Sequence, residues 1–418
     1  MADSVRNAAA RIDAATPYGR DRAVDALRAL AVVGVVLGHW LVTALTLGDE
    51  GQLLGDSPLR HLPALVPASW VLQSLALFFL VGGCVAARGY AAARDRGASY
   101  GSWLRARLNR LFRPAAGVLV LWTVVAGALF ATGAGYETVH TLLVLVLSPL
   151  WFLLVFAALT ALTPLVARLH PLWPLAVVLH VDLFRFGYGG GPGGLGWVNV
   201  LAGWLVPYCL GCAWARGAFA RARTAVALLV PGVLGTVVLV LWAGYPAGMV
   251  GVPGAEVSNL NPPTLAAVSF GLAQCGAALL LREPLRRAMR RPLLWAGVAL
   301  LNLSAMTVFL WHQTAMLAVT ALGRAADPLT GPLTGLHTVP DGAGWVLARL
   351  AWLPVFALVL GLCLAAFGAL ERPRAAPVVV VAAGDAVPPG TAPAAGAAAG
   401  RTDAAARTRA AVGESAPG

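Results

Sequence analysis

Long apolar segments separated by short polar connections dominate this chain. Each segment approaches or exceeds the length that an α-helix needs to cross a hydrocarbon core about 30 Å thick. The pattern predicts ten transmembrane helices. The fifth is the shortest and carries His180, Asp182 and Arg185, and the ninth is long enough to be tilted, broken or preceded by an interfacial turn. The segments cover roughly residues 24–46, 69–90, 114–133, 141–166, 172–187, 197–215, 225–244, 264–281, 293–322 and 345–369.

The composition agrees with a membrane protein. Of the 418 residues, 59% are hydrophobic and 11% are charged, whereas a soluble globular protein carries about 25% charged residues. The net charge of +12 could suggest nucleic acid as a partner. However, the arginines cluster in short connections, where they control membrane topology. We therefore expect an all-α, polytopic protein whose surroundings are the lipid bilayer and not nucleic acid.

The arginines occupy alternate connections. They gather at residues 20–28, 88–113, 168, 216–223, 282–291 and 372–374. The opposite connections are poor in arginine, because residues 47–68 contain only Arg60 and residues 245–263 contain none. Positively charged connections stay in the cytoplasm. The alternation therefore predicts an even number of helices with both termini in the cytoplasm.

The chain divides into three predicted parts. Residues 1–20 form a cytoplasmic N-terminal segment, and residues 21–372 form one membrane domain whose first apolar run is an uncleaved helix. Residues 373–418 are an Ala-, Pro- and Gly-rich cytoplasmic tail that we expect to be disordered. The five cysteines lie in apolar segments, and Cys209 and Cys212 lack a second ligand pair. We therefore predict neither a disulfide framework nor a metal site.

Arg28 and His39 are the most informative residues of the first apolar run. Eleven residues of α-helix amount to three turns and about 20°, so both side chains lie on one helix face about 16 Å apart. If Arg28 lies at the inner edge of the membrane, His39 lies near its middle, where an ionisable group is costly and indicates function. Asp25 lies close to the same face and can orient or pair with Arg28.

The first run, RAVDALRALAVVGVVLGHW, resembles the first helix of acyltransferase family 3, whose members are bacterial membrane enzymes that O-acylate sugars and other hydroxylated acceptors. An arginine and a histidine separated by ten residues are the hallmark of that helix, and Arg28 and His39 match them. LALFFLVGGCVAARGY resembles the second helix of the family, in which two phenylalanines precede a Ser-Gly pair. Here Gly82 and Gly83 occupy that position, which removes one hydroxyl.

Three further segments support the resemblance, which covers about residues 20–370. Arg110-x-x-Arg113 matches an arginine pair that commonly precedes the third helix. LSPLWFLLVF, with Trp151, resembles the fourth helix, and SAMTVFLWHQTAML resembles a late helix whose histidine corresponds to His312. Residues 21–372 are thereby identified as an acyltransferase-like domain.

The resemblance implies an O-acyltransferase in the bacterial plasma membrane. It would move an acyl group, most simply acetyl, from cytoplasmic acyl-CoA to a hydroxyl of a cell-envelope glycan, a lipid-linked sugar or a secreted metabolite. Acyl-CoA is then a co-substrate, and no bound cofactor is implied.

Within this reading each matched residue has an expected role. His39 would be the general base or a transient acyl carrier. Arg28 would bind and polarise the donor. The guanidinium groups of Arg110 and Arg113 suit the donor phosphates. Asp25, Trp151 and His312 are supporting candidates, and we expect His312 toward the outer half of the membrane, on the acceptor side or in a structural role.

Two other classes of function remain open at the sequence level. In a transporter or exporter, Arg28 and His39 would form a proton or anion path, although many carriers contain internal repeats and none is evident here. In a non-catalytic membrane scaffold, replacement of either residue would have no effect.

Overall fold

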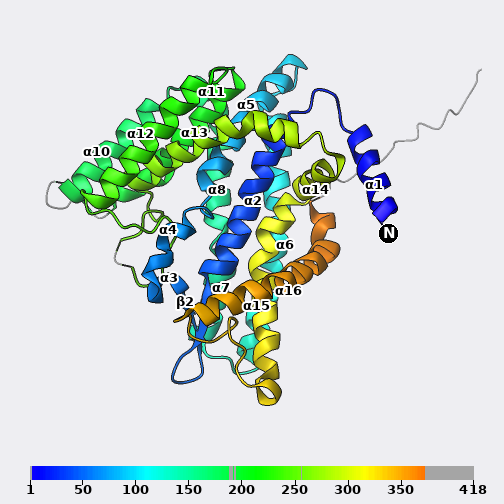
Figure 1. Cartoon of the computed structure of the whole chain (residues 1–418), viewed down its shortest axis with the longest axis vertical. Coiled ribbons are helices and arrows are strands. Elements are labelled where there is room, and N and C mark those ends of the chain that lie inside the picture. The colour runs from blue at the N-terminus through cyan, green and yellow to red at the C-terminus, as the bar shows by residue number, and fades with distance from the viewer. Residues whose placement is uncertain (1, 188–191, 193, 256, 372–418) are drawn as a thin grey trace, which may run out of the picture. The chain divides into compact units, whose positions relative to one another are not determined.

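The computed structural model describes residues 2–187, 192, 194–255 and 257–371 (Figure 1). The predicted tail, residues 373–418, lies outside the described residues. All ten predicted apolar runs contain helix, and the prediction of an all-α polytopic membrane protein is confirmed. The helices of these runs are α2 (Arg22–Val42), α5 (Leu75–Asp95), α6 (Tyr100–Ala131), α7 (Tyr136–Leu147) with α8 (Leu150–Ala161), α10 (Leu172–Asp182), α11 (Val198–Ala215), α12 (Ala222–Leu241), α13 (Leu265–Ala288), α14 (Pro292–Leu303) with α15 (Ala305–Thr330), and α16 (Ala343–Phe367).

Nine helical segments of the described part are long and apolar enough to cross a membrane. The fifth predicted run is the exception, because α10 has 11 residues and continues only as the five-residue π-helix Leu183–Gly187. The smaller elements lie at the chain start and in the connections. They are α1 (Ala2–Ala14), α3 (Pro58–His61), α4 (Val66–Ser69), α9 (Thr163–Val166) and the antiparallel strands β1 (Ala44–Leu47) and β2 (Leu53–Asp56).

The ninth predicted run is broken, which was one of the alternatives the sequence left open. α14 ends at Leu303 and α15 begins at Ala305, with Ser304 between them outside helical geometry. The carboxylate of Glu371 accepts the backbone N–H of Met306 at 3.1 Å and that of Thr307 at 3.0 Å. The first N–H groups of a helix have no partner within it, and a negative charge there is favourable. Glu371 therefore stabilises the start of α15.

Figure 1 shows α2 at the centre of the bundle, with α10 to α13 on one side and α6, α14, α15 and α16 on the other. Side chains of α2 pack against α5, α13, α14 and α15. Glycines allow the closest helix approaches. A Cβ atom on Gly211 would lie 2.0 Å from the carbonyl oxygen of Leu80 in α5, and one on Gly276 would lie 2.5 Å from the nitrogen of Leu229 in α12. Such small-residue contacts are the usual means of packing helices in lipid.

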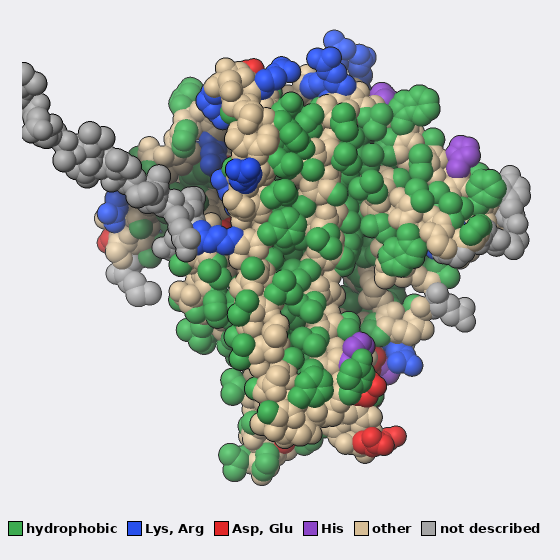
Figure 2. Space-filling model, turned by 180° about the vertical axis from the view of Figure 1, so that it is seen from behind, with side chains coloured by type: hydrophobic (Ala, Val, Ile, Leu, Met, Phe, Trp, Pro, Cys, Tyr) green, Lys and Arg blue, Asp and Glu red, His purple; other side chains and the backbone are tan. Residues whose placement is uncertain are grey.

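Charged side chains are distributed unevenly along the bundle. On the face shown in Figure 2, arginines gather toward one end and acidic side chains toward the other, with a broad apolar band between them. This is the distribution that a protein surrounded by hydrocarbon requires.

Arg349 of α16 fixes the end of α2. Its side chain is 1% exposed, and its Nε donates to the carbonyl of Trp40 at 2.6 Å. The terminal nitrogens donate to the carbonyls of Thr43 at 2.8 Å and Gly335 at 2.7 Å. The last carbonyls of a helix have no partner within it and carry partial negative charge. The guanidinium therefore satisfies the carboxyl end of α2, close to His39.

We expect Arg349→Met to lower the free energy of unfolding by about 3 kcal/mol, because it leaves three carbonyls without donors in an apolar interior. Thermal or denaturant unfolding of the detergent-solubilised protein measures this change. Arg324→Met is the matched control, since Arg324 makes an exposed bond to the carbonyl of Gly51 and its loss should cost about 0.5 kcal/mol or less. Equal losses in the two variants would contradict this role of Arg349.

Candidate active site

His39 and His312 meet between α2 and α15. Their ring centroids are 5.0 Å apart, and the indole nitrogen of the adjacent Trp40 donates to the carbonyl of His312 at 2.9 Å. The side-chain amide nitrogen of Gln313 lies 3.1 Å from Nδ1 of His39. Two imidazoles and one amide thus form a polar cluster inside the bundle.

The depth predicted for His312 is wrong in relation to His39. We expected His312 farther toward the outer half, because its depth was counted from the start of the ninth run near residue 293. In the structure the break at Ser304 starts α15 anew at Ala305, and the two histidine rings lie side by side. His312 therefore belongs to the same site as His39.

The cluster contains polar atoms without a partner among the described residues. His312 and Gln313 are both 0% exposed, yet Nε2 of His312 and Oε1 of Gln313 make no hydrogen bond within that part of the chain. Nδ1 of His312 lies 2.6 Å from the carbonyl of Phe309. A carbonyl only accepts, so Nδ1 carries the proton and Nε2 presents a lone pair. Buried polar atoms without partners are rare and are explained by function in many proteins.

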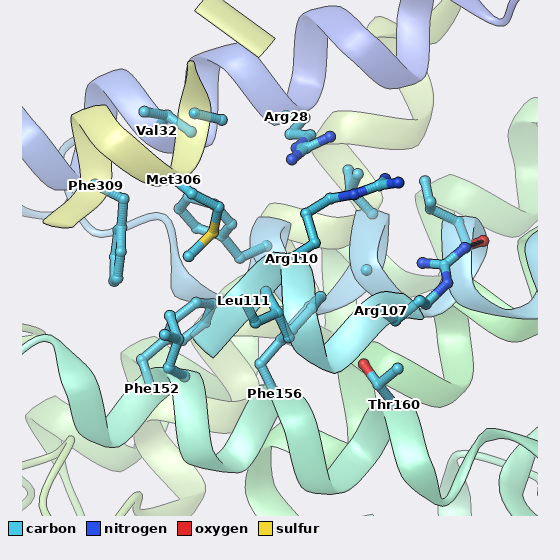
Figure 3. A pocket seen from close by; sticks show the side chains of 16 residues that line it. Arg28, Val32, Arg107, Arg110, Leu111, Phe152, Phe156, Thr160, Met306 and Phe309 are labelled. Carbon is cyan, nitrogen blue, oxygen red and sulfur yellow. Dashed lines mark hydrogen bonds between the residues drawn. The ribbon is translucent and has the colours of Figure 1, made fainter. Parts of the chain in front are cut away.

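A cavity of about 170 Å³ lies between α2, α5, α6, α8 and α15. Figure 3 shows that the two ends of this cavity differ in character. The guanidinium groups of Arg28, Arg107 and Arg110 lie at one end, and phenylalanines line the other. The cavity can therefore hold an anionic group and an apolar chain of the same ligand. The phenylalanines are Phe78, Phe152, Phe156 and Phe309.

The histidines lie next to the apolar end of the cavity, although neither His39 nor His312 is among the residues that line it. Phe309 lines the cavity, and its ring centroid is 6.2 Å from that of His312. On α2, Val32 lines the cavity between the level of Arg28 and that of His39. Along the cavity, the order is thus the arginines first, then the phenylalanine wall, and then the histidine pair between α2 and α15.

The structure brings together some of the arginines predicted to bind the donor. Arg28 and Arg110 line the cavity, whereas Arg113 is not among the residues that form its wall. Arg107, which was not predicted as a site residue, also lines the cavity. The signal for Arg107 was present in the sequence. It precedes Arg110 by three residues and so shares a helix face with it.

Two supporting candidates lie elsewhere. The carboxylate of Asp25 pairs with Arg20 at 2.6 Å, and this hydrogen bond raises the pKa of Arg20 above its ordinary value. Asp25 therefore pairs with Arg20 instead of with Arg28, because Arg20 reaches it from the segment before α2. Trp151 is 38% exposed and does not line the cavity. It contacts Phe152, which does line the cavity, and Trp204. In the described ranges, no three His, Cys, Asp or Glu side chains are grouped closely enough to hold a metal ion.

Comparison with known proteins assigns the family. Residues 21–368 match the model of the acyltransferase domain that defines acyltransferase family 3, so the chain belongs to this family. It is thus a multi-pass membrane acyltransferase. Neither a curated protein nor a solved structure matches the chain. The cavity and the histidine pair at its apolar end are the candidate active site.

Proposed function

We propose that this protein transfers an acyl group, most simply acetyl, from cytoplasmic acyl-CoA to a hydroxyl of an acceptor made or exposed at the bacterial plasma membrane. Cell-envelope carbohydrates, lipid-linked sugars and secreted metabolites are the acceptor classes. The observation that carries the proposal is a single cavity with arginines at one end and a histidine pair beyond the other.

The shape and charge of the cavity suit an acyl-CoA. This donor carries phosphates at one end, a thioester at the other, and a flexible arm between them. The guanidinium groups of Arg28, Arg107 and Arg110 offer forked donors to phosphate oxygens. The phenylalanine wall accommodates the arm. The thioester is thereby directed toward His39 and His312.

His39 is the proposed general base. The acceptor oxygen attacks the thioester carbonyl carbon while its proton passes to the imidazole of His39. The C–S bond then breaks, and the same proton returns to the departing thiolate, so that CoA leaves as a thiol. An acyl group carried transiently on the imidazole is the alternative route to the same products. The family assignment favours these two enzymatic routes over a function as transporter or exporter.

Gln313 is the proposed positioning residue for His39. Its amide nitrogen lies 3.1 Å from Nδ1 of His39. Its oxygen, which has no partner among the described residues, can accept a hydrogen bond from an N–H at Nδ1 after a half-turn of the amide. Because an amide offers both a donor and an acceptor, Gln313 can hold the ring in either tautomer. The ring of His39 thus keeps one orientation, whichever of its two nitrogens carries the proton.

We expect His39→Ala to lower acyl transfer by about 10²- to 10⁴-fold, the usual contribution of a general base. The measurement is release of CoA thiol from acetyl-CoA by purified protein, together with O-acylated product in cells. His180→Ala is the matched control, because His180 lies on α10 and is exposed. Undiminished product at normal expression of His39→Ala would rule out the assignment.

We expect Gln313→Leu to reduce kcat by about 10-fold or more with little change in KM for the donor, because the variant frees the His39 ring without altering the arginine end. Steady-state kinetics separates the two constants. Gln274→Leu serves as control, since this amide on α13 contacts the carbonyl of Gln73. A rise in KM with unchanged kcat would count against the positioning role, and restored turnover in Gln313→Asn would support it.

A further inference from the structure

A second cavity adjoins the first at the junction of α5 and α6. Its volume is about 530 Å³, and its polar wall is formed by Arg96, Ser102, Trp103, Arg107 and Arg110. Arg107 and Arg110 line both cavities, so the two spaces share an arginine boundary. We propose that this second cavity binds the adenosine bisphosphate end of the acyl donor. This inference rests on the proposed use of acyl-CoA.

The volumes of the two cavities indicate which part of the donor each cavity can hold. Sites for drug-sized ligands measure about 300–1,000 Å³. The first cavity, at about 170 Å³, is too small for a whole coenzyme and suits the acylated arm. The second, at about 530 Å³, has the size of a nucleotide site. The shared arginines then lie where the diphosphate joins the two parts of the donor.

Arg107 is built into the boundary. One of its terminal nitrogens donates to the carbonyl of Val85 at 3.0 Å, and the guanidinium lies 5.3 Å from the centre of the Trp103 ring. A Cβ atom on Gly89 would lie 2.1 Å from that same terminal nitrogen. A side chain at position 89 would displace the guanidinium from this place, so Gly89 leaves room for it beside α5. With one nitrogen anchored, the others remain available to ligand oxygens.

Trp103 supplies the group that distinguishes a nucleotide from a simple anion. It is 7% exposed, it lines the second cavity, and its indole N–H has no partner among the described residues. Its ring can stack on a base, or its indole N–H can donate to a ring nitrogen of a purine that lies edge-on to the ring. Inorganic phosphate or an anionic lipid headgroup can accept from the arginines and from the indole N–H, but neither has an aromatic face to stack on Trp103.

The test compares two donors that differ only in the nucleotide. We expect Arg96→Gln to raise the ratio of KM for acetyl-CoA to KM for S-acetylpantetheine by about fivefold, because Arg96 lines only the second cavity and is exposed to solvent, which screens its interaction with a phosphate. We expect Trp103→Leu to raise the same ratio further. Arg94→Gln is the matched control, since Arg94 lies on the same helix end outside the cavity wall.

Direct binding provides the second readout. Adenosine 3′,5′-bisphosphate should bind the purified wild-type protein and bind more weakly to Arg96→Gln and Trp103→Leu. If the substitutions changed KM equally for both donors, the nucleotide assignment would be overturned. Displacement of the bisphosphate by inorganic phosphate or phosphatidylglycerol micelles to the same extent in all variants would overturn it as well. Failure of the wild-type protein to release CoA thiol from acetyl-CoA when a membrane extract supplies acceptors would instead refute the proposed function, while bisphosphate binding would still test the second cavity.

Discussion

The bond network of Arg349 is the constraint on which the candidate site depends. In hydrocarbon a backbone carbonyl without a donor is costly, and α2 ends inside the bundle beside His39. Arg349 satisfies the carbonyls of Trp40 and Thr43, and the indole of Trp40 in turn holds the carbonyl of His312. Three helices far apart in the sequence, α2, α15 and α16, are thereby joined at one level. The distance between the two histidines follows from this junction.

The site combines two environments that a lipid-embedded enzyme has to keep apart. The arginines lie at one end of the cavity, and the histidines lie beyond the phenylalanines of the other end. Within that apolar shell, Nε2 of His312 and Oε1 of Gln313 lack partners among the described residues. Polar atoms without hydrogen-bond partners reduce the stability of the fold. Their presence at the apolar end of the cavity is explained by a substrate that supplies the missing hydrogen bonds.

Sequence reasoning succeeded where the relevant residues share one helix. Arg28 and His39 could be placed on a common face because their spacing alone defines it. Sequence reasoning was insufficient where the interacting residues come from different helices. Gln313 reaches His39 across 274 residues of chain, and Arg20 takes the carboxylate of Asp25 from outside the helix. The level of His312 depends on the break at Ser304, which the apolar pattern permitted but did not require.

The carboxylate of Glu371 at the start of α15 has a consequence for biosynthesis. The helix that carries His312 and Gln313 is completed by a residue 65 positions after Met306, at the end of the described chain. During translation α2 and His39 enter the membrane long before that carboxylate exists. The histidine pair therefore reaches its final form only when the whole domain has been made.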